Sequence, residues 1–195
     1  MNMTGANVFR DAGEPRVVPC VAADAAILRN LYPLYLHDLA EFTQELRPNR
    51  YGVYDGDDTV TTLAQWGDAN LAEWWNRPGI LYPYLIHVGE RAVGFALVSS
   101  PPCLRDGTGF LMNEFFLTRS FRHQGIARSA ARQVLDRHRG RWQAVVLERN
   151  IPAQRFWRRV FAGYENGVYS ETAEEATIFG DFPAVVFAFD NGASH

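Results

Sequence analysis

The chain has 195 residues, 47% of them hydrophobic, and a formal net charge of −3 at pH 7. This length and apolar content predict one domain over residues 1–195, and the acidic balance disfavours general affinity for nucleic acid. Because there is no basic-then-apolar leader, no apolar run of roughly 18 residues and no cysteine pair at metal-ligand spacing, we expect a cytoplasmic protein without a membrane segment, disulfide or metal site.

The N-terminal part of the chain is predicted to be helical. Residues 23–42 place apolar side chains at helical spacing, and Pro33 predicts either a kink or a break between two helices. Residues 47–62 are rich in Gly, Asp and Pro, which is typical of a loop. The run LAEWWN, residues 71–76, predicts a short helix after that loop.

A hairpin and a third strand are predicted next. Two β-rich runs, 81–88 and 92–99, flank Gly89 and Glu90, and a glycine that comes first in a two-residue connection suits a type II′ turn. A third strand is expected over residues 109–118. After Gly125 an apolar stripe with a 3.6-residue period predicts a helix, which we expect Gly140 to cap after three basic residues.

The C-terminal part alternates strands with a helix. Residues 142–149 predict a strand, and IPAQRFWRRVF, residues 151–161, predicts a helix that Gly163 ends. Residues 183–190 predict a last strand, after a weaker one near 168–172. Antiparallel strands followed by strand, helix, strand, helix and strand indicate an α/β domain with a mixed sheet.

The stretch FRHQGIAR, residues 121–128, lies between a predicted strand and a predicted helix. Unpaired N–H groups and a partial positive charge at a helix N-terminus, a glycine backbone, and Arg122 and Arg128 together suit a bound pyrophosphate. The alternative is that Gly125 only permits a tight turn and that the arginines are solvated. The G-x-G-x-x-G and G-x-x-x-x-G-K-[ST] patterns are missing, which disfavours dinucleotide and P-loop folds.

Two motifs in order resemble one known family. Arg122-His-Gln-Gly125-Ile-Ala127 matches the R-x-x-G-x-G/A signature of the GNAT superfamily of N-acetyltransferases. NIPAQRFW, residues 150–157, resembles the next segment of that superfamily, in which Asn follows a strand. The resemblance covers roughly residues 80–165, and MNEFFLTRSFRHQGIAR is also similar to a bacterial group of predicted acetyltransferases within the superfamily.

The resemblance implies a mixed, mostly antiparallel sheet that is flanked by helices and split between two strands. The strand that carries Phe115 to Thr118 and the strand that ends at Arg149 would diverge, and the pantetheine arm of acetyl-CoA would lie in the gap. Helices within about 23–76 would face the acceptor, and about 80–165 would form the acetyl-CoA-binding core. The residues implied in cosubstrate binding are Phe116, Leu117, Thr118, Arg122, His123, Gln124, Gly125, Ile126, Ala127, Arg128 and Asn150.

Glu114 is the candidate catalytic base. A carboxylate in the middle of an apolar strand is costly unless it is paired, hydrated or useful, and Glu114 resembles the base on this strand in many superfamily members. The alternative is that Glu114 forms a salt bridge or caps a neighbouring group. Because side chains alternate along a strand, we expect Asn113 to point to the opposite face, so that only one of the pair lines the cleft. His123 is interpreted as a surface turn residue.

One position departs from the family pattern. Trp157 stands where many members have a tyrosine thought to protonate the departing thiolate, and an indole N–H is no acid at neutral pH. An acidic and aromatic set in the N-terminal segment would suit a cationic amine if it lines the cleft, and would otherwise be core and solvated surface. Its members are Tyr35, Asp38, Glu41, Trp66, Trp74 and Trp75.

These observations predict an acetyl-CoA-dependent N-acetyltransferase that acts on a small-molecule or peptide amine by direct attack. The alternative is a non-catalytic acyl-CoA-binding or sensing domain, which Trp157 would support. A fold reused only for protein interaction is disfavoured because it would not require a phosphate-binding pattern. The acceptor, the acyl length and the oligomeric state stay open, and a homodimer is compatible with the sequence.

Overall fold

A computed structural model describes residues 13–54, 57–102, 104, 107–164, 167–177 and 181–192. The elements in chain order are β1 (Arg16–Pro19), the 3-10 turn η1 (Ala22–Asp24), α1 (Ala25–Leu39), α2 (Leu63–Leu71), α3 (Glu73–Asn76), β2 (Leu81–Val88), β3 (Arg91–Ser99), β4 (Phe110–Leu117), the 3-10 turn η2 (Arg119–Phe121), α4 (Ile126–Leu135), β5 (Arg141–Leu147), α5 (Ile151–Ala162), β6 (Ser170–Thr177) and β7 (Asp181–Asp190).

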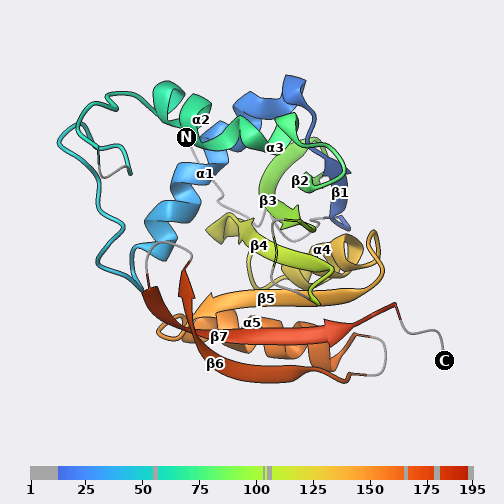
Figure 1. The fold of residues 1–195 in the computed structure, drawn as a ribbon. Helices are drawn as coiled ribbons and strands as arrows, with labels where there is room; N and C mark the ends of the chain where they lie inside the picture. The colour runs from blue at the N-terminus through green and yellow to red at the C-terminus, as the bar shows by residue number, and fades with distance from the viewer. Residues whose placement is uncertain are drawn as a thin grey trace, which may run out of the picture.

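The strands form one open sheet with the order β1-β2-β3-β4-β5-β7-β6 (Figure 1). Every neighbouring pair is antiparallel except β4 and β5, which are parallel. The prediction of a mixed, mostly antiparallel sheet flanked by helices is therefore confirmed.

The sheet carries a separate hydrophobic cluster on each face. Leu85, Phe95 and Leu97 from β2 and β3 pack with α1 and α2 in one cluster, whereas Ile86 and Val98 belong to the cluster of α4 and α5. This division follows from the period of two along a strand, which sends neighbouring residues to opposite faces. The helices therefore form two layers, with the sheet between them.

The sheet opens between β4 and β5. Their ladder joins only Phe110 to Met112 with Trp142 to Ala144, after which each strand keeps a partner on its other side, β3 for β4 and β7 for β5. The described chain places no strand against the facing edges of residues 113–117 and 145–147. The expected split between these two strands is therefore present.

A β-bulge interrupts β4 at the start of this opening. Leu97 pairs with Glu114 and Val98 pairs with Met112, so Asn113 is an extra residue on β4 without a partner in the register. A bulge bends its strand and redirects the side chains around it. The position of Glu114 thus depends on a local irregularity as well as on strand alternation.

The structure differs from or narrows the sequence predictions at three places. Helix α1 continues through Pro33, which excludes the break between two helices that the sequence left as one alternative, and Leu28 and Leu36, on either side of the proline, are both buried in the same cluster. The short strand β1 was not predicted, and its Val17 is held by Gln133, which accepts from the Val17 N–H. Helix α4 ends at Leu135 and not near Gly140.

The early end of α4 has a tertiary cause. Just after the helix, Arg137 donates to the carbonyl of Val17, and the ring of His138 forms a 2.7 Å hydrogen bond with the hydroxyl of Tyr84. These bonds turn the segment toward β1 and β2. Gly140 lies beyond them, where its N–H donates to Asn191 Oδ1 at 2.8 Å.

Candidate active site

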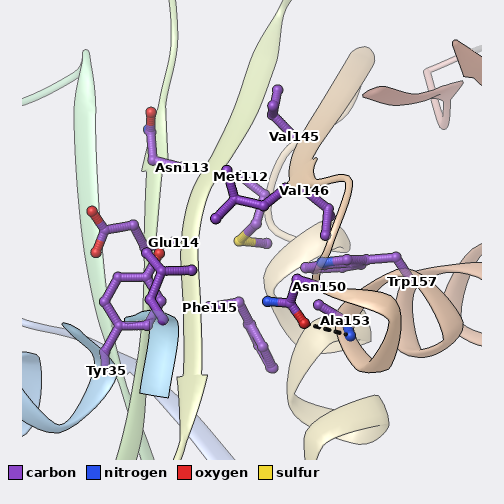
Figure 2. A pocket seen from close by; sticks show the side chains of 12 residues that line it. Tyr35, Met112, Asn113, Glu114, Phe115, Val145, Val146, Asn150, Ala153 and Trp157 are labelled. Carbon is purple, nitrogen blue, oxygen red and sulfur yellow. Dashed lines mark hydrogen bonds between the residues drawn. The ribbon is translucent and has the colours of Figure 1, made fainter. Parts of the chain in front are cut away.

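A cavity of about 90 Å³ lies where β4 and β5 diverge (Figure 2). Its wall comes from four elements and the residue that precedes α5, and most of its side chains are apolar or aromatic. The lining residues are Tyr35, Leu39, Met112, Asn113, Glu114, Phe115, Val145, Val146, Leu147, Asn150, Ala153 and Trp157. This volume corresponds to about three water molecules, so it has room for a group of acetyl size.

Glu114 is the acidic group of this wall. One of its oxygens, Oε1, accepts a hydrogen bond from the hydroxyl of Tyr32, and Oε2 is buried and has no hydrogen-bond partner among the described residues. Burial raises the pKa of Glu114 to about 8, and the hydrogen bond from Tyr32 opposes that rise. A carboxyl with a pKa near the pH of the solution can both accept and release a proton.

Aromatic rings surround this carboxyl on the side of α1. Tyr32 stacks on Phe95 with 5.5 Å between ring centroids, and it also contacts Trp66 and Tyr35. Phe116 packs against Phe95 at 5.6 Å. These rings exclude water from the carboxyl, which is the physical reason for its raised pKa.

Asn113 and Glu114 both line the cavity, so the prediction that only one of them could do so was wrong. The bulge at Asn113 is the reason, because it breaks strict alternation between the two residues. Figure 2 shows their side chains pointing in different directions from β4. The Asn113 amide is already engaged, since Nδ2 donates to Ser99 Oγ at 2.7 Å.

Asn150 lies across the opening from Phe115 (Figure 2). It caps α5, with Oδ1 accepting from the Ala153 N–H at 3.1 Å. Because the cap uses the oxygen, Nδ2 is left to face the gap, and Figure 2 shows it pointing toward Phe115. Asn150 thus has a fixed orientation that presents a hydrogen-bond donor.

Trp157 contributes packing to the same wall. Its ring stacks on Phe161 with 5.2 Å between centroids and meets Phe115 edge-on at 5.6 Å. The residue is buried. These contacts account for an aromatic residue at this position without any role in proton transfer.

The loop between η2 and α4 contains two residues with left-handed backbone geometry. His123 and Gly125 both have positive φ, 64° and 80°, and Gly125 is the N-cap of α4. A Cβ added at Gly125 would meet nothing within 4 Å, so the left-handed backbone, and not crowding, favours glycine there. Gln124 donates to the Ser120 carbonyl at 3.0 Å, which holds the loop to η2.

Arg122 connects this loop to α1. Its guanidinium donates to the Leu117 carbonyl at 2.7 Å and to Asp38, and it lies 5.6 Å from the centre of the Phe116 ring. Arg119 bonds the other oxygen of Asp38 at 2.7 Å. Although the sequence suggested the Arg122 side chain as a phosphate ligand, in this structure it is already bound to a carboxylate.

The other expected cosubstrate residues lie along the same path. Phe116 and Leu117 are buried at the end of β4, and the Thr118 N–H already donates to the Val93 carbonyl at 2.8 Å. Ile126 is buried in the first turn of α4, whereas Ala127 beside it is partly exposed and Arg128 is exposed. The end of β4 thus forms one side of the β4–β5 opening and Asn150 lies on the other side. The loop from Arg122 to Gly125 follows the end of β4.

The predicted acceptor-side residues have several different environments. Tyr35 lines the cavity and Trp66 is buried, while Trp75 donates through Nε1 to the Cys20 carbonyl at 2.8 Å. Trp74 packs against the same cluster, and Glu41 is exposed. Tyr32 was missed, although it lies three residues before Tyr35 on the buried side of α1.

The described residues form neither a cluster of metal-ligating side chains nor a membrane-spanning helix. Within the described ranges, no group of three or more His, Cys, Asp or Glu side chains is placed to hold a metal ion. No helix in this part of the chain is long and apolar enough to cross a membrane. Cys20 is a buried free thiol, and Cys103 lies outside the described residues.

A family model described as the acetyltransferase (GNAT) family matches residues 39–162. Among solved structures, the chain is similar to a ribosomal-protein-S5-alanine acetyltransferase from Vibrio fischeri, with 17% identity, a TM-score of 0.60, and coverage of 92% of this chain and 94% of that one. It is also similar to a ribosomal L7/L12 α-N-protein acetyltransferase in complex with coenzyme A, with 14% identity, a TM-score of 0.61, and coverage of 93% and 96%.

A third similar structure is AAC(6')-Ib in complex with paromomycin and acetyl-CoA, with 14% identity, a TM-score of 0.61, and coverage of 91% of this chain and 94% of that one. At these identities the structures share the fold with this chain. No curated protein matched the sequence.

Proposed function

Because the chain belongs to the acetyltransferase (GNAT) family, we propose that it transfers the acetyl group of acetyl-CoA to a primary amine by direct attack. The observation that carries this proposal is Glu114, a buried carboxyl with a pKa of about 8 in the wall of the cavity between β4 and β5. Such a group suits a general base, because it can take a proton from an amine near neutral pH.

The residues around the opening fit acetyl-CoA as a cosubstrate. The facing edge of β4, which has no strand against it among the described residues, suits the amides of a pantetheine arm near Phe116 to Thr118. The left-handed Gly125 and the first N–H groups of α4, with the segment from Arg122 to Arg128, suit the pyrophosphate. Asn150 Nδ2 would meet the arm from the side of β5 and α5.

The proposed reaction is a single acyl transfer. The amine nitrogen forms a bond with the thioester carbonyl carbon, the carbon–sulfur bond breaks, and CoA leaves as its thiolate. Glu114 takes the proton that the amine loses, directly or through a water molecule. A backbone N–H of β4 near Phe115 or Phe116 would polarise the carbonyl oxygen, as a preorganised donor does in other acyl transfers.

The departing thiolate needs no acid from Trp157. A thiol has a reference pKa of about 8.5, so its thiolate is a tolerable leaving group near neutral pH. An indole N–H is a hydrogen-bond donor but not an acid under these conditions. We therefore assign packing, and not proton donation, to Trp157.

A second candidate is a domain that binds acyl-CoA without turnover. It is favoured by Trp157, which occupies the wall with a ring that cannot donate a proton. The buried carboxyl of Glu114 favours the enzyme, because a binding domain would gain nothing from a costly group that lacks a partner for Oε2.

Two measurements on the purified protein separate these candidates. We expect acetyl-CoA to raise the melting temperature, and we expect free thiol to appear when an amine from a broad panel is added. Binding without thiol release from any amine would favour the non-catalytic domain. A melting temperature that saturating acetyl-CoA leaves unchanged would contradict both.

A further inference from the structure

The wall of the cavity offers an entering cation almost no compensating charge. Glu114 is the one carboxylate among the described residues that line it, and the remaining polar side-chain atoms belong to Tyr35, Asn113, Asn150 and Trp157. The Asn113 amide is bound to Ser99, and the Asn150 oxygen is bound to the Ala153 N–H. An ammonium group that left water here would find its only negatively charged side chain in Glu114.

The carboxylate of α1, Asp38, is not available to bind an ammonium group. Asp38 lies three residues after Tyr35, and its two oxygens bind Arg119 and Arg122. The side chain of Asp38 is only 19% exposed. Two guanidinium groups on one carboxylate leave a net positive charge at this point, which does not favour a polycationic acceptor.

The charged and titratable groups near Glu114 come from α1, η2 and the loop after η2. β3 and α2 present Phe95, Leu97 and Trp66, and the residues of β5 and α5 that line the cavity are uncharged. The charged or titratable groups are Tyr32, Tyr35 and Asp38 from α1, and Arg119 and Arg122 from η2 and the loop after it.

We propose that the preferred acceptor presents an α-amino group, as in an amino acid amide or a peptide N-terminus, and not the alkylamine of lysine or a polyamine. This inference rests on the proposed acetyl transfer and names the class of amine that the same site accepts. An α-amino group is partly uncharged near neutral pH, so it can enter an apolar cavity without carrying an unpaired charge from water.

The proton transfer to Glu114 favours the same class. The reference pKa of an α-amino group is about 7.7 to 8.0, whereas that of a lysine amine is about 10.4. Glu114 has a pKa of about 8, so it exchanges a proton with an α-ammonium group at almost no cost. For a lysine ammonium the same transfer is unfavourable by roughly two powers of ten.

Two isomeric acceptors test this inference. Nε-acetyl-lysinamide has only a free α-amine, and Nα-acetyl-lysinamide has only a free ε-amine. The two have the same composition and differ only in which amine nitrogen can react. Thiol release would be measured for each with saturating acetyl-CoA, and spermidine would serve as a polyamine probe.

At pH 7 we expect kcat/KM to be about 10²-fold higher for the free α-amine, from the difference in the uncharged fraction of the two amines. Between pH 7 and pH 9 this ratio should fall about tenfold, because the ε-amine loses its proton in that range more steeply than the α-amine does. The fall with pH distinguishes an effect of charge from an effect of shape.

Equal or faster turnover of the free ε-amine or of spermidine at pH 7 would overturn the inference while leaving the proposed function in place. A preference that does not change with pH would also overturn it, since shape alone would then explain the selection. If none of the three is acetylated, the inference fails. The melting temperature with acetyl-CoA and the broad amine panel then decide whether the proposed function fails with it.

Discussion

Glu114 lies near the middle of β4, and Gly125 lies in the loop beyond its end. Different interactions hold the two residues in place. Glu114 is surrounded by side chains from α1, α2 and β3, and its partner Tyr32 is 82 residues away in the sequence. The loop around Gly125 takes its shape from its own backbone, with positive φ at residues 123 and 125. A site built by packing can change the acidity of a buried group, whereas a site built by local backbone geometry presents N–H groups to a ligand.

The largest expected effect concerns the buried surroundings of Glu114 and is measured as a change in the free energy of unfolding with pH. The folded pKa of Glu114 is about 8, above its ordinary value of 4.5, so the unfolded chain loses this proton first as pH rises. The contribution of Glu114 to the free energy of unfolding is therefore complete below pH 4.5. It decreases by about 1.4 kcal/mol per pH unit between pH 4.5 and pH 8.

Glu114→Gln does not titrate at this position. As pH rises over this range, the free energy of unfolding of the variant should therefore increase relative to that of the wild type. Urea unfolding of both proteins at pH 5, 6.5 and 8 measures this increase. The same substitution at the exposed residue Glu41 is the control. A difference between Glu114→Gln and wild type that stays constant with pH would mean that the carboxyl is not held in a water-excluding environment.

The next effect concerns the loop around Gly125. Acetyl-CoA at 100 times its dissociation constant should stabilise the protein by about 2.7 kcal/mol. Gly125→Asp should abolish the resulting rise in melting temperature, because it brings a side chain and a negative charge to the proposed phosphate site.

Gly79→Asp is the matched control for Gly125→Asp. Gly79 also has positive φ, 82°, with nothing within 4 Å of an added Cβ, and it precedes β2 at the opposite end of the β2–β4 strands. It should carry the same backbone strain and keep the shift. If Gly125→Asp folds and keeps the full shift as well, the phosphate site does not lie at this loop.

A smaller effect concerns the contact between Tyr32 and Glu114. The hydrogen bond from Tyr32 lowers the pKa of Glu114, so Tyr32→Phe should raise it further, by about one unit or 1.4 kcal/mol. The rising limb of the pH–rate profile should move to higher pH, while the plateau at high pH is kept. Tyr35→Phe removes a hydroxyl one turn along α1 and should not reproduce this shift, because no hydrogen bond joins Tyr35 to Glu114 in the described structure. Equal shifts in the two variants would contradict the role of the Tyr32 bond.

The smallest effect on turnover is expected at Trp157. Trp157→Phe keeps an aromatic ring against Phe115 and Phe161, so kcat should fall less than tenfold, well below the effect of losing a general acid. Steady-state kinetics with acetyl-CoA affinity measured in parallel would check this. A thousandfold loss with unchanged affinity would assign Trp157 a direct part in the chemistry.

The same contrast explains what the sequence could predict. The loop at 121–128 and the hairpin at Gly89 are encoded within a few residues, and turn preferences identified them. The split between β4 and β5 followed from the family resemblance, since no local pattern shows where two strands diverge.

The features that escaped prediction depend on partners far along the chain. Asp38 binds Arg119 and Arg122, 81 and 84 residues away, so the sequence alone left it as an acid either on a solvated face or in the acceptor cleft. The bulge at Asn113 depends on how β4 pairs with β3, and strand alternation therefore misplaced that side chain. The short strand β1 is too brief for a periodic signal and is fixed by contacts with Gln133 and Arg137.

The most direct test of the central claim is the pH dependence of kcat/KM for wild type and Glu114→Gln with one good amine acceptor. We predict that the variant binds acetyl-CoA normally and is slower at pH 7 by about 10²- to 10⁴-fold, the usual contribution of a general base. With an acceptor whose amine pKa lies well above 7, such as a lysine amine, the loss should shrink as pH approaches that pKa, because solution then supplies the uncharged nucleophile. A folded Glu114→Gln protein that is as fast as wild type at pH 7 would contradict the assignment of Glu114 as the base.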